Sequence, residues 1–321
     1  MVLWTYLLMI LAKLTIQILL GGGSMTFDLL MQYLTNAISL GSLYALIAIG
    51  YTMVYGILRL INFAHGEIFM MSLYFAFYGV TLFTLPWYLA FAMAILLTTL
   101  LGMVVERAAY KPLRDSPRIT IMVSAIGVSF FLQNLAIVLF GGRPSTFPNI
   151  KLLTDVIKIG SVSLQKLTLI IPITTLLLLY GLQVLVHKSK TGMAMRAVSK
   201  DHETARLMGV DVNKTITITF GIGSVLAAIG GIMWGAKFPA ILPTMGVMPG
   251  IKCFIAAVIG GIGNITGAVI GGFILGVVEV MLVAYLPSLT GYRDAFAFIL
   301  LIVILLFKPT GIMGEKISEK V

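Results

Sequence analysis

Long apolar runs separated by short polar segments set the pattern of this chain. Nine such runs occur, at residues 36–58, 63–82, 87–106, 119–140, 167–186, 215–235, 251–263, 266–286 and 295–307. Most of them approach the ~20 residues that a helix needs to cross a hydrocarbon core of ~30 Å. The run at 167–186 is apolar on every face, whereas a membrane barrel alternates polar and apolar residues over ~10-residue strands. The pattern predicts an all-α polytopic membrane protein with about eight to ten transmembrane helices.

The run at 251–263 is too short to cross the membrane as a straight helix. We expect a broken or re-entrant segment there, which is tolerated where protein or water lines it. Asn264 follows this run directly. Its side-chain amide could therefore bond the backbone groups that a broken helix leaves free.

Glycines are concentrated in the sequence GGIGNITGAVIGGFILG, at residues 260–276. Four-residue spacings link Gly263, Gly267 and Gly271, and a second series links Gly272 and Gly276. Such spacing leaves one helix face nearly bare and lets helices approach closely. We expect these glycines to pack helices together rather than to contact substrate.

Composition and charge place the chain in a membrane with a defined orientation. Its mean hydropathy of +1.05 and its 11% of charged residues lie outside the range of soluble domains. The net charge of +10 would suggest nucleic acid in a soluble protein, but here Lys and Arg divide by side of the membrane, fourteen against seven. The richer side holds residues 188–214 and the C-terminus, which we expect in the cytoplasm, and we expect no nucleic-acid partner.

Residues 1–24 fit this scheme poorly. The sequence MVLWTYLLMILAKLTIQILL lacks the basic start and cleavage site of a signal peptide, carries Lys13, and is followed by GGGS and Met25. One interpretation is an extension upstream of a natural start at Met25, and the other is a genuine extra helix. Residues 25–321 are expected to form a single transmembrane domain.

The polar sequence RLINFAHGEIFMM, residues 59–71, interrupts the apolar pattern. On a helix Asn62 and His65 share one face, and Phe63 lies beside Glu67 on the next. A charge at the bilayer centre costs about 2.5–3.5 kcal/mol, so Glu67 there would be functional or paired. Two interpretations stay open: an ordinary helix–turn–helix at the cytoplasmic end, with Asn62 as cap and His65 bonded to backbone, or part of a translocation path or gate.

Residues 188–214 form a cytoplasmic amphipathic segment. At helical spacing one face carries Ala194, Ala197, Val198, Ala205 and Met208, interrupted by Asp201, and the opposite face carries Arg196, Lys200 and Glu203. Ser199 or Asp201 could cap a second short helix, and Gly209 suits its C-terminal end. From charge and period alone, the segment could lie on lipid headgroups or dock into a groove on a protein partner.

Signatures of enzymatic chemistry do not occur in the sequence. There is no G-x-x-x-x-G-K-[ST] sequence to hold nucleotide phosphates. The three histidines, His65, His187 and His202, lack metal-ligand spacing, and Cys253 has no partner cysteine. We expect no metal site, no cofactor bound by this chain and no enzymatic activity.

Several of these sequences resemble a known family. LGSLYALIAIGYTMVYGILRLINFAHGEIFMM, TGMAMRAVSKDHETARLMGV, AAVIGGIGNITGAVIGGFILG and KPTGIMG are similar to the membrane permease subunit of bacterial ABC importers for branched-chain amino acids. The resemblance runs from about Thr35 to Gly314. Related permeases for urea and short-chain amides share these motifs, so the substrate is not settled among them.

The resemblance assigns a role to the cytoplasmic segment. ETARLMG is similar to the E-A-A-x-x-x-G pattern through which ABC permeases contact their ATPase: Glu203, Ala205 and Gly209 match, Thr204 replaces an alanine, and the downstream proline is missing. With these we group Arg196, Asp201 and His202 as residues expected to couple to the ATPase.

The resemblance also implies partners for the chain in the bacterial cytoplasmic membrane. They are cytosolic ABC ATPase subunits that use ATP, a second homologous permease, a periplasmic or extracellular substrate-binding protein, and membrane lipid. The outer segment 141–166 is the longest candidate for contact with the binding protein.

Two other classes stay open. An ATP-independent channel or secondary transporter would place ionisable residues deep in several spans, yet only Glu279 clearly lies there, with Glu106 near a boundary. A structural or assembly subunit would tolerate joint replacement of Asn62, His65 and Glu67.

Overall fold

The protein is described by a computed structural model that covers residues 27–114, 116–159 and 162–314. Residues 1–24, for which the sequence left two interpretations, lie outside these ranges. Lys316 and Lys320, which contribute to the predicted charge of the C-terminal tail, also lie outside them.

Each predicted span coincides with a helix. In chain order these are α2 (Phe27–Leu58), α3 (His65–Thr81), α4 (Trp87–Val105), α5 (Arg118–Phe140), α7 (Lys166–Lys188), α10 (Val212–Lys237), α11 (Val247–Gly260), α12 (Ile265–Tyr285) and α13 (Arg293–Phe307). Within the described residues, seven helical segments are long and apolar enough to cross a membrane. α3, with 17 residues, and α11, with 14, are shorter. The all-α polytopic prediction is confirmed.

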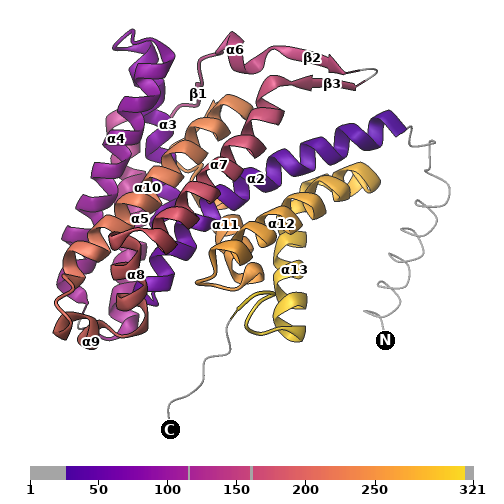
Figure 1. The fold of residues 1–321 in the computed structure, drawn as a ribbon. Helices are drawn as coiled ribbons and strands as arrows, with labels where there is room; N and C mark the ends of the chain where they lie inside the picture. The colour runs from indigo at the N-terminus through magenta and orange to yellow at the C-terminus, as the bar shows by residue number, and fades with distance from the viewer. Residues whose placement is uncertain (1–26, 115, 160–161, 315–321) are drawn as a thin grey trace, which may run out of the picture.

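Shorter elements lie at the ends of these helices. η1 (Glu106–Tyr110), which is π-helical, and η2 (Lys111–Leu113) continue α4, and η3 (Pro287–Tyr292) precedes α13. α8 (Lys190–Lys200) and α9 (His202–Leu207) form the segment between α7 and α10. α6 (Lys151–Thr154), β1 (Ser145–Thr146), β2 (Val156–Ile159), β3 (Val162–Gln165) and β4 (Ala240–Ile241) lie at the opposite end of the bundle from α8 and α9 (Figure 1).

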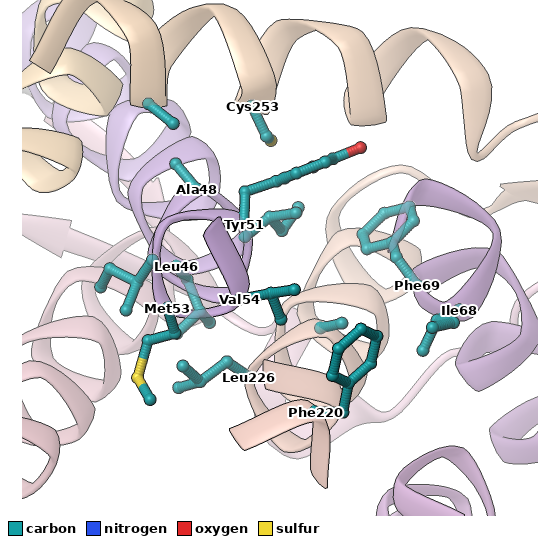
Figure 2. Close-up of a cluster of buried hydrophobic side chains, with 14 of the residues drawn as sticks. Leu46, Ala48, Tyr51, Met53, Val54, Ile68, Phe69, Phe220, Leu226 and Cys253 are labelled. Carbon is teal, nitrogen blue, oxygen red and sulfur yellow. The ribbon is translucent and has the colours of Figure 1, made fainter. Parts of the chain in front are cut away.

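α2 is the central helix of the bundle. It packs against α7, α10, α11 and α12 (Figure 1), and it is buried over most of its length. Figure 2 shows Met53 and Val54 of α2 in the same buried cluster as Phe220 and Leu226 of α10. Because α2 is apolar and buried on all sides, it serves as the core element on which the outer helices are placed.

The glycines of α12 pack it against two different helices. Gly267 and Gly271 lie against the backbone carbonyls of Gly260 and Ala256 on α11, whereas Gly272 and Gly276 face α2. The predicted role in helix packing therefore fits these four positions. Gly263 differs, because α12 begins only at Ile265 and Gly263 lies in the preceding turn with φ +95°. Its inclusion in the packing face is wrong, since a positive φ marks a turn glycine.

Asn264 holds that turn as the sequence predicts. Its Oδ1 accepts a hydrogen bond from the backbone N–H of Gly267 at 2.9 Å, and its Nδ2 donates to the carbonyl of Met313 at 3.0 Å. It thus caps α12 and ties the end of the described chain to the α11–α12 turn.

The position of Lys252 differs from the one assumed in the charge count. Lys252 is one of the seven Lys and Arg residues that the sequence placed in outer loops. It lies instead within α11, because that helix begins at Val247 and runs through Pro249. Its Nζ contacts Oε1 of Glu279 at 2.9 Å and Oδ1 of Asp294 at 2.7 Å. Glu279 also accepts a hydrogen bond from the hydroxyl of Tyr44 at 2.7 Å. The deep carboxylate of α12 is therefore neutralised within the bundle.

An antiparallel hairpin of β2 and β3 occupies the segment 141–166. Its register pairs Val156 with Gln165 and Lys158 with Ser163. An ion pair between Nζ of Lys166 and Oδ2 of Asp155, at 2.9 Å, closes its base. β1 pairs antiparallel with β4 and connects this segment to the region after α10. Val156, Lys158, Ser163 and Gln165 of the hairpin are exposed, whereas Leu164 is buried.

Candidate translocation site and coupling face

Residues 59–64 turn back into the bundle. Arg59, directly after α2, has φ +55°, a left-handed conformation that reverses the chain sharply. The next polar side chains are almost fully buried, with 2% of Asn62 and 1% of His65 exposed. The ring of His65 lies 4.6 Å from that of Tyr51, which precedes the last residue of α2 by seven positions. α3 therefore starts about 10 Å inside the end of α2.

The two parts of the interfacial helix–turn–helix interpretation have different outcomes. The N-cap of α3 is Ala64, and no side chain caps it, so the prediction of Asn62 as cap is wrong. Asn62 instead accepts, at Oδ1, a hydrogen bond of 2.7 Å from the hydroxyl of Tyr110. The ring of His65 is hydrogen-bonded to the backbone of Ile47, as that interpretation expects. Buried polar groups at that depth are costly, so they need partners or a ligand.

The π-helical turn η1 positions Tyr110. A π-helical turn accommodates an extra residue and often marks a functional site. In the same turn Glu106, fully buried, forms an ion pair with Arg114 and accepts a hydrogen bond from the hydroxyl of Thr217 at 2.7 Å. This fixes the turn against α10. Nothing in the apolar pattern predicted it, because a π-helical turn has no signature in hydrophobic periodicity.

His65 fits closely against α2. A side chain at position 50 would bring its Cβ within 2.6 Å of Cε1 of His65, so Gly50 makes room for the ring. Figure 2 shows Tyr51 extending from α2 into the space between the helix that carries Cys253 and the helix that carries Phe69. Nε2 of His65 is buried without a hydrogen-bond partner among the described residues.

Glu67 lies at the centre of the site. It is 1% exposed, and its Oε1 accepts hydrogen bonds from Nε2 of Gln133 at 2.8 Å and from the hydroxyl of Ser129 at 3.3 Å, both on α5. Its Oε2 has no hydrogen-bond partner within the described chain. The carboxylate is therefore held through Oε1, while Oε2 is buried beside Gly246 without a hydrogen-bond partner among the described residues.

A cavity of about 250 Å³ adjoins Glu67. α5 and α11 form its walls, and the start of α3 forms its floor together with Tyr51 of α2. Its lining residues are Tyr51, Phe63, Gly66, Glu67, Ile126, Ser129, Phe130, Gln133, Gly246, Val247, Gly250, Ile251 and Phe254. Of the four residues predicted for a translocation path, Phe63 and Glu67 line this cavity. Sequence reasoning did not select the residues of α5 and α11, because they are remote along the chain.

The segment 188–214 forms two helices rather than one helix with a continuous apolar face. α8 ends at Lys200, and Asp201 caps α9, with Oδ1 accepting from the backbone N–H of Glu203 at 2.9 Å. The second helix and its cap are as predicted for Asp201, while the Ser199 hydroxyl bonds within α8. Gly209 follows α9 with φ +83°, as expected for a helix end. The break at Asp201 makes the single apolar face predicted over 194–208 wrong.

The residues predicted to couple to an ATPase divide between two faces. Arg196, Asp201, His202, Glu203 and Gly209 are exposed. Ala205 is 4% exposed and packs toward the bundle. Leu207 and Met208, which the sequence did not select as docking residues, are 87% and 80% exposed.

α9 is attached to the end of α2. Nε2 of His202 lies 3.0 Å from the carbonyl oxygen of Ile57. Nearby, Nη2 of Arg59 lies 3.5 Å from the carbonyl of Ser199. Both contacts are at the point where the chain turns back toward Glu67. The helices α8 and α9 and the buried site thus share one short connecting segment.

Comparison with known proteins identifies the family. Residues 33–305 match the family described as "Branched-chain amino acid transport system / permease component". The chain is 41% identical over 304 residues to the high-affinity branched-chain amino acid transport system permease protein BraD of Pseudomonas aeruginosa, covering 91% of this chain and 98% of that protein. It is equally similar, at 41% over 304 residues, to LivH of Escherichia coli K12, covering 91% and 97%. A probable LivH of Methanocaldococcus jannaschii is 28% identical over 88% of this chain and 91% of its own length. The chain is a multi-pass membrane protein that belongs to the family of branched-chain amino acid transport permease components.

Proposed function

We propose that this chain is the transmembrane permease subunit of an ATP-driven importer of branched-chain amino acids. The high identity to BraD and LivH over nearly the whole chain supports this substrate class. The observation that carries the energy coupling is the contact of His202 with Ile57, which joins an exposed cytoplasmic helix to the segment leading into the buried site.

The exposed surface of α9 is the docking site for a cytosolic ABC ATPase. Leu207 and Met208 present apolar side chains, and Glu203 and Arg206 flank them with opposite charges. A short amphipathic helix of this kind fits a groove on a partner. The ATPase uses ATP, and this chain binds no nucleotide.

Movement of α9 reaches the site through Ile57 and Arg59. ATP binding and the loaded binding protein must each favour one of two permease states, since a ligand with equal affinity for both shifts nothing. A second homologous permease subunit completes the path. The element that responds is the connecting segment 59–64, between α2 and α3.

The orientation follows from the positive residues. α8, α9 and the C-terminus lie in the cytoplasm of the bacterial cell, because Lys and Arg are enriched on that side of the cytoplasmic membrane. The hairpin of β2 and β3 then lies outside, where it contacts the substrate-binding protein.

Copurification tests the coupling. The full chain is solubilised in detergent as bait with its cellular partners, and Leu207→Asp is compared with Phe83→Asp. Phe83 is another exposed apolar residue, 60% against 87% for Leu207, at the other end of the bundle. We expect an ABC ATPase to copurify with the unaltered chain and with Phe83→Asp, and to be lost with Leu207→Asp. If monodisperse unaltered bait brings down no ATPase, the proposal fails in favour of a channel or secondary transporter.

Uptake tests the substrate. The complex reconstituted with its binding protein should import leucine when ATP is supplied on the cytoplasmic side. Import of urea or a short-chain amide in place of leucine would instead assign the chain to that related group of permeases.

A further inference from the structure

Three carboxylates are buried among the described residues of the bundle, and they differ in their partners. Glu106 pairs with Arg114, and Glu279 pairs with Lys252. Glu67 has no cationic partner within the described chain. A buried carboxylate left without a cation is expensive, and it marks a binding function.

Two helix N-termini and two side chains of α5 surround the carboxyl group of Glu67. Glu67 lies in the first turn of α3, and its Oε2 lies beside Gly246, the N-cap of α11, where a Cβ would come within 2.8 Å of that oxygen. The N-termini of two helices thus converge on the carboxylate, and both stabilise negative charge. Gln133 and Ser129 donate to Oε1 only. Oε2 has no hydrogen-bond partner among the described residues, and Glu67 is one of the residues that line the cavity.

The cavity suits a small amphipathic molecule. Its volume of about 250 Å³ exceeds the ~150 Å³ of an apolar cavity that accepts benzene. Apart from the groups around Glu67, its walls are aliphatic and aromatic, with Phe63, Phe130, Phe254, Ile126, Val247 and Ile251. A few polar groups at one end of an apolar cavity are typical of a site that orients its ligand.

We infer that this cavity binds a branched-chain amino acid inside the permease, with the ligand's α-ammonium group on the carboxylate of Glu67 and its aliphatic side chain against the walls of α5 and α11. The inference rests on the proposed function for the substrate class, and it adds a binding site and the residue that recognises the charge. The N-terminus of α11, at Gly246 and Val247, offers partial positive charge to the ligand's carboxylate.

This arrangement of groups distinguishes leucine from small molecules of related structure. An amine with the same aliphatic chain retains the contact with Glu67, whereas the corresponding carboxylic acid lacks the ammonium group and meets a carboxylate of like charge. Urea has neither the positive charge nor the apolar group. The site therefore ranks leucine and 3-methylbutylamine above 4-methylpentanoate and urea.

The test measures equilibrium binding of radiolabelled leucine to the complete transporter in lipid nanodiscs without its binding protein. Glu67→Gln keeps the shape and hydrogen bonds of the side chain and removes its charge. Ile126→Trp fills the cavity from the exposed side of α5 without touching Glu67. Asp28→Asn, at an exposed position in the first turn of α2, is the matched control for loss of one negative charge.

We expect Glu67→Gln to weaken leucine binding about tenfold or more, the loss typical of a hydrogen bond to a charged group. Ile126→Trp should weaken it as well, and Asp28→Asn should leave it unchanged. Excess 3-methylbutylamine should displace leucine from the unaltered complex, and 4-methylpentanoate should not.

Equal leucine affinity in Glu67→Gln and the unaltered complex would overturn the site. So would an unaltered complex that imports leucine with ATP and binding protein but binds none on its own, and in that case the proposed function would stand. An unaltered, assembled complex that imports no leucine at all would overturn the proposed function itself.

Discussion

The hydroxyl of Tyr110 donates a hydrogen bond of 2.7 Å to Oδ1 of Asn62. This bond joins the π-helical turn after α4 to the segment 59–64, which connects α2 to α3. Both side chains are buried, with 1% and 2% exposed. Because Nδ2 of Asn62 has no partner among the described residues, this bond holds the Asn62 side chain, while Arg59 holds the start of the segment through the carbonyl of Ser199.

Tyr110→Phe should therefore loosen the segment without disturbing the packing of the ring. It leaves a buried acceptor unsatisfied, which costs about 1–3 kcal/mol. We expect a lower thermal unfolding temperature and slower ATP-driven uptake of leucine. Tyr180→Phe, at a position 69% exposed, is the control and should change neither. Unchanged stability and uptake in Tyr110→Phe would show that the bond does not hold the segment.

Lys252→Met should destabilise the bundle, because it removes a cation from the buried carboxylate of Glu279. Breaking a buried ion pair from one side costs about 3–5 kcal/mol. The unfolding temperature of the purified chain should fall, and the double variant Lys252→Met with Glu279→Gln should recover part of the loss. A double variant less stable than Lys252→Met alone would contradict the assignment of the pair as mutual neutralisation.

Gly272→Ala should disturb the packing of α12 on α2. An added Cβ would lie 2.6 Å from Cα of Ala45, which is backbone and has no room to move without a shift of the helix. Gly181→Ala on α7 meets nothing within 4 Å and should be neutral or stabilising by up to about 1 kcal/mol. Thermal unfolding of the two variants in the same detergent compares them directly. If Gly272→Ala and Gly181→Ala change the unfolding temperature equally, the close approach of α12 to α2 does not explain the requirement for glycine at position 272.

His202→Ala should separate docking from transmission. The imidazole contacts the carbonyl of Ile57, while the proposed docking residues Leu207 and Met208 are on the exposed side of the segment. We expect the ATPase to copurify as before and ATP-driven uptake to fall several-fold, since the contact is one hydrogen bond of about 1 kcal/mol. Loss of the ATPase together with uptake would instead place His202 in the docking surface. Uptake at the unaltered rate would remove His202 from the coupling path.

The helices could be predicted from the sequence because apolar length alone specifies a membrane span. α5, predicted at 119–140, runs over Arg118–Phe140, and α12, predicted at 266–286, over Ile265–Tyr285. Helix caps formed by a side chain and a backbone N–H two or three residues further on could also be predicted, as Asp201 and Asn264 show. These features depend on residues that are close along the chain.

The site could be predicted only in part because its depth depends on distant residues. Arg59 suggested an interface, yet Asn62 and Glu67 are held inside the bundle by Tyr110 and Gln133, which follow them by 48 and 66 positions. Lys252 was misplaced for a similar reason: its partner Glu279 belongs to another helix. Polar residues in apolar surroundings indicated that a site exists, whereas its walls required the folded structure.

The cavity beside Glu67 has one wall on α5 and the other on α11, so its volume depends on the separation of these helices. A bound molecule that fills it keeps the walls apart and thereby resists any motion that brings them together. By thermodynamic reciprocity, a conformational change that narrows the cavity weakens the bound molecule's affinity by the same free energy. A molecule bound in this cavity is then released by the approach of α5 and α11 itself, because narrowing of the cavity and dissociation of the molecule belong to one coupled equilibrium.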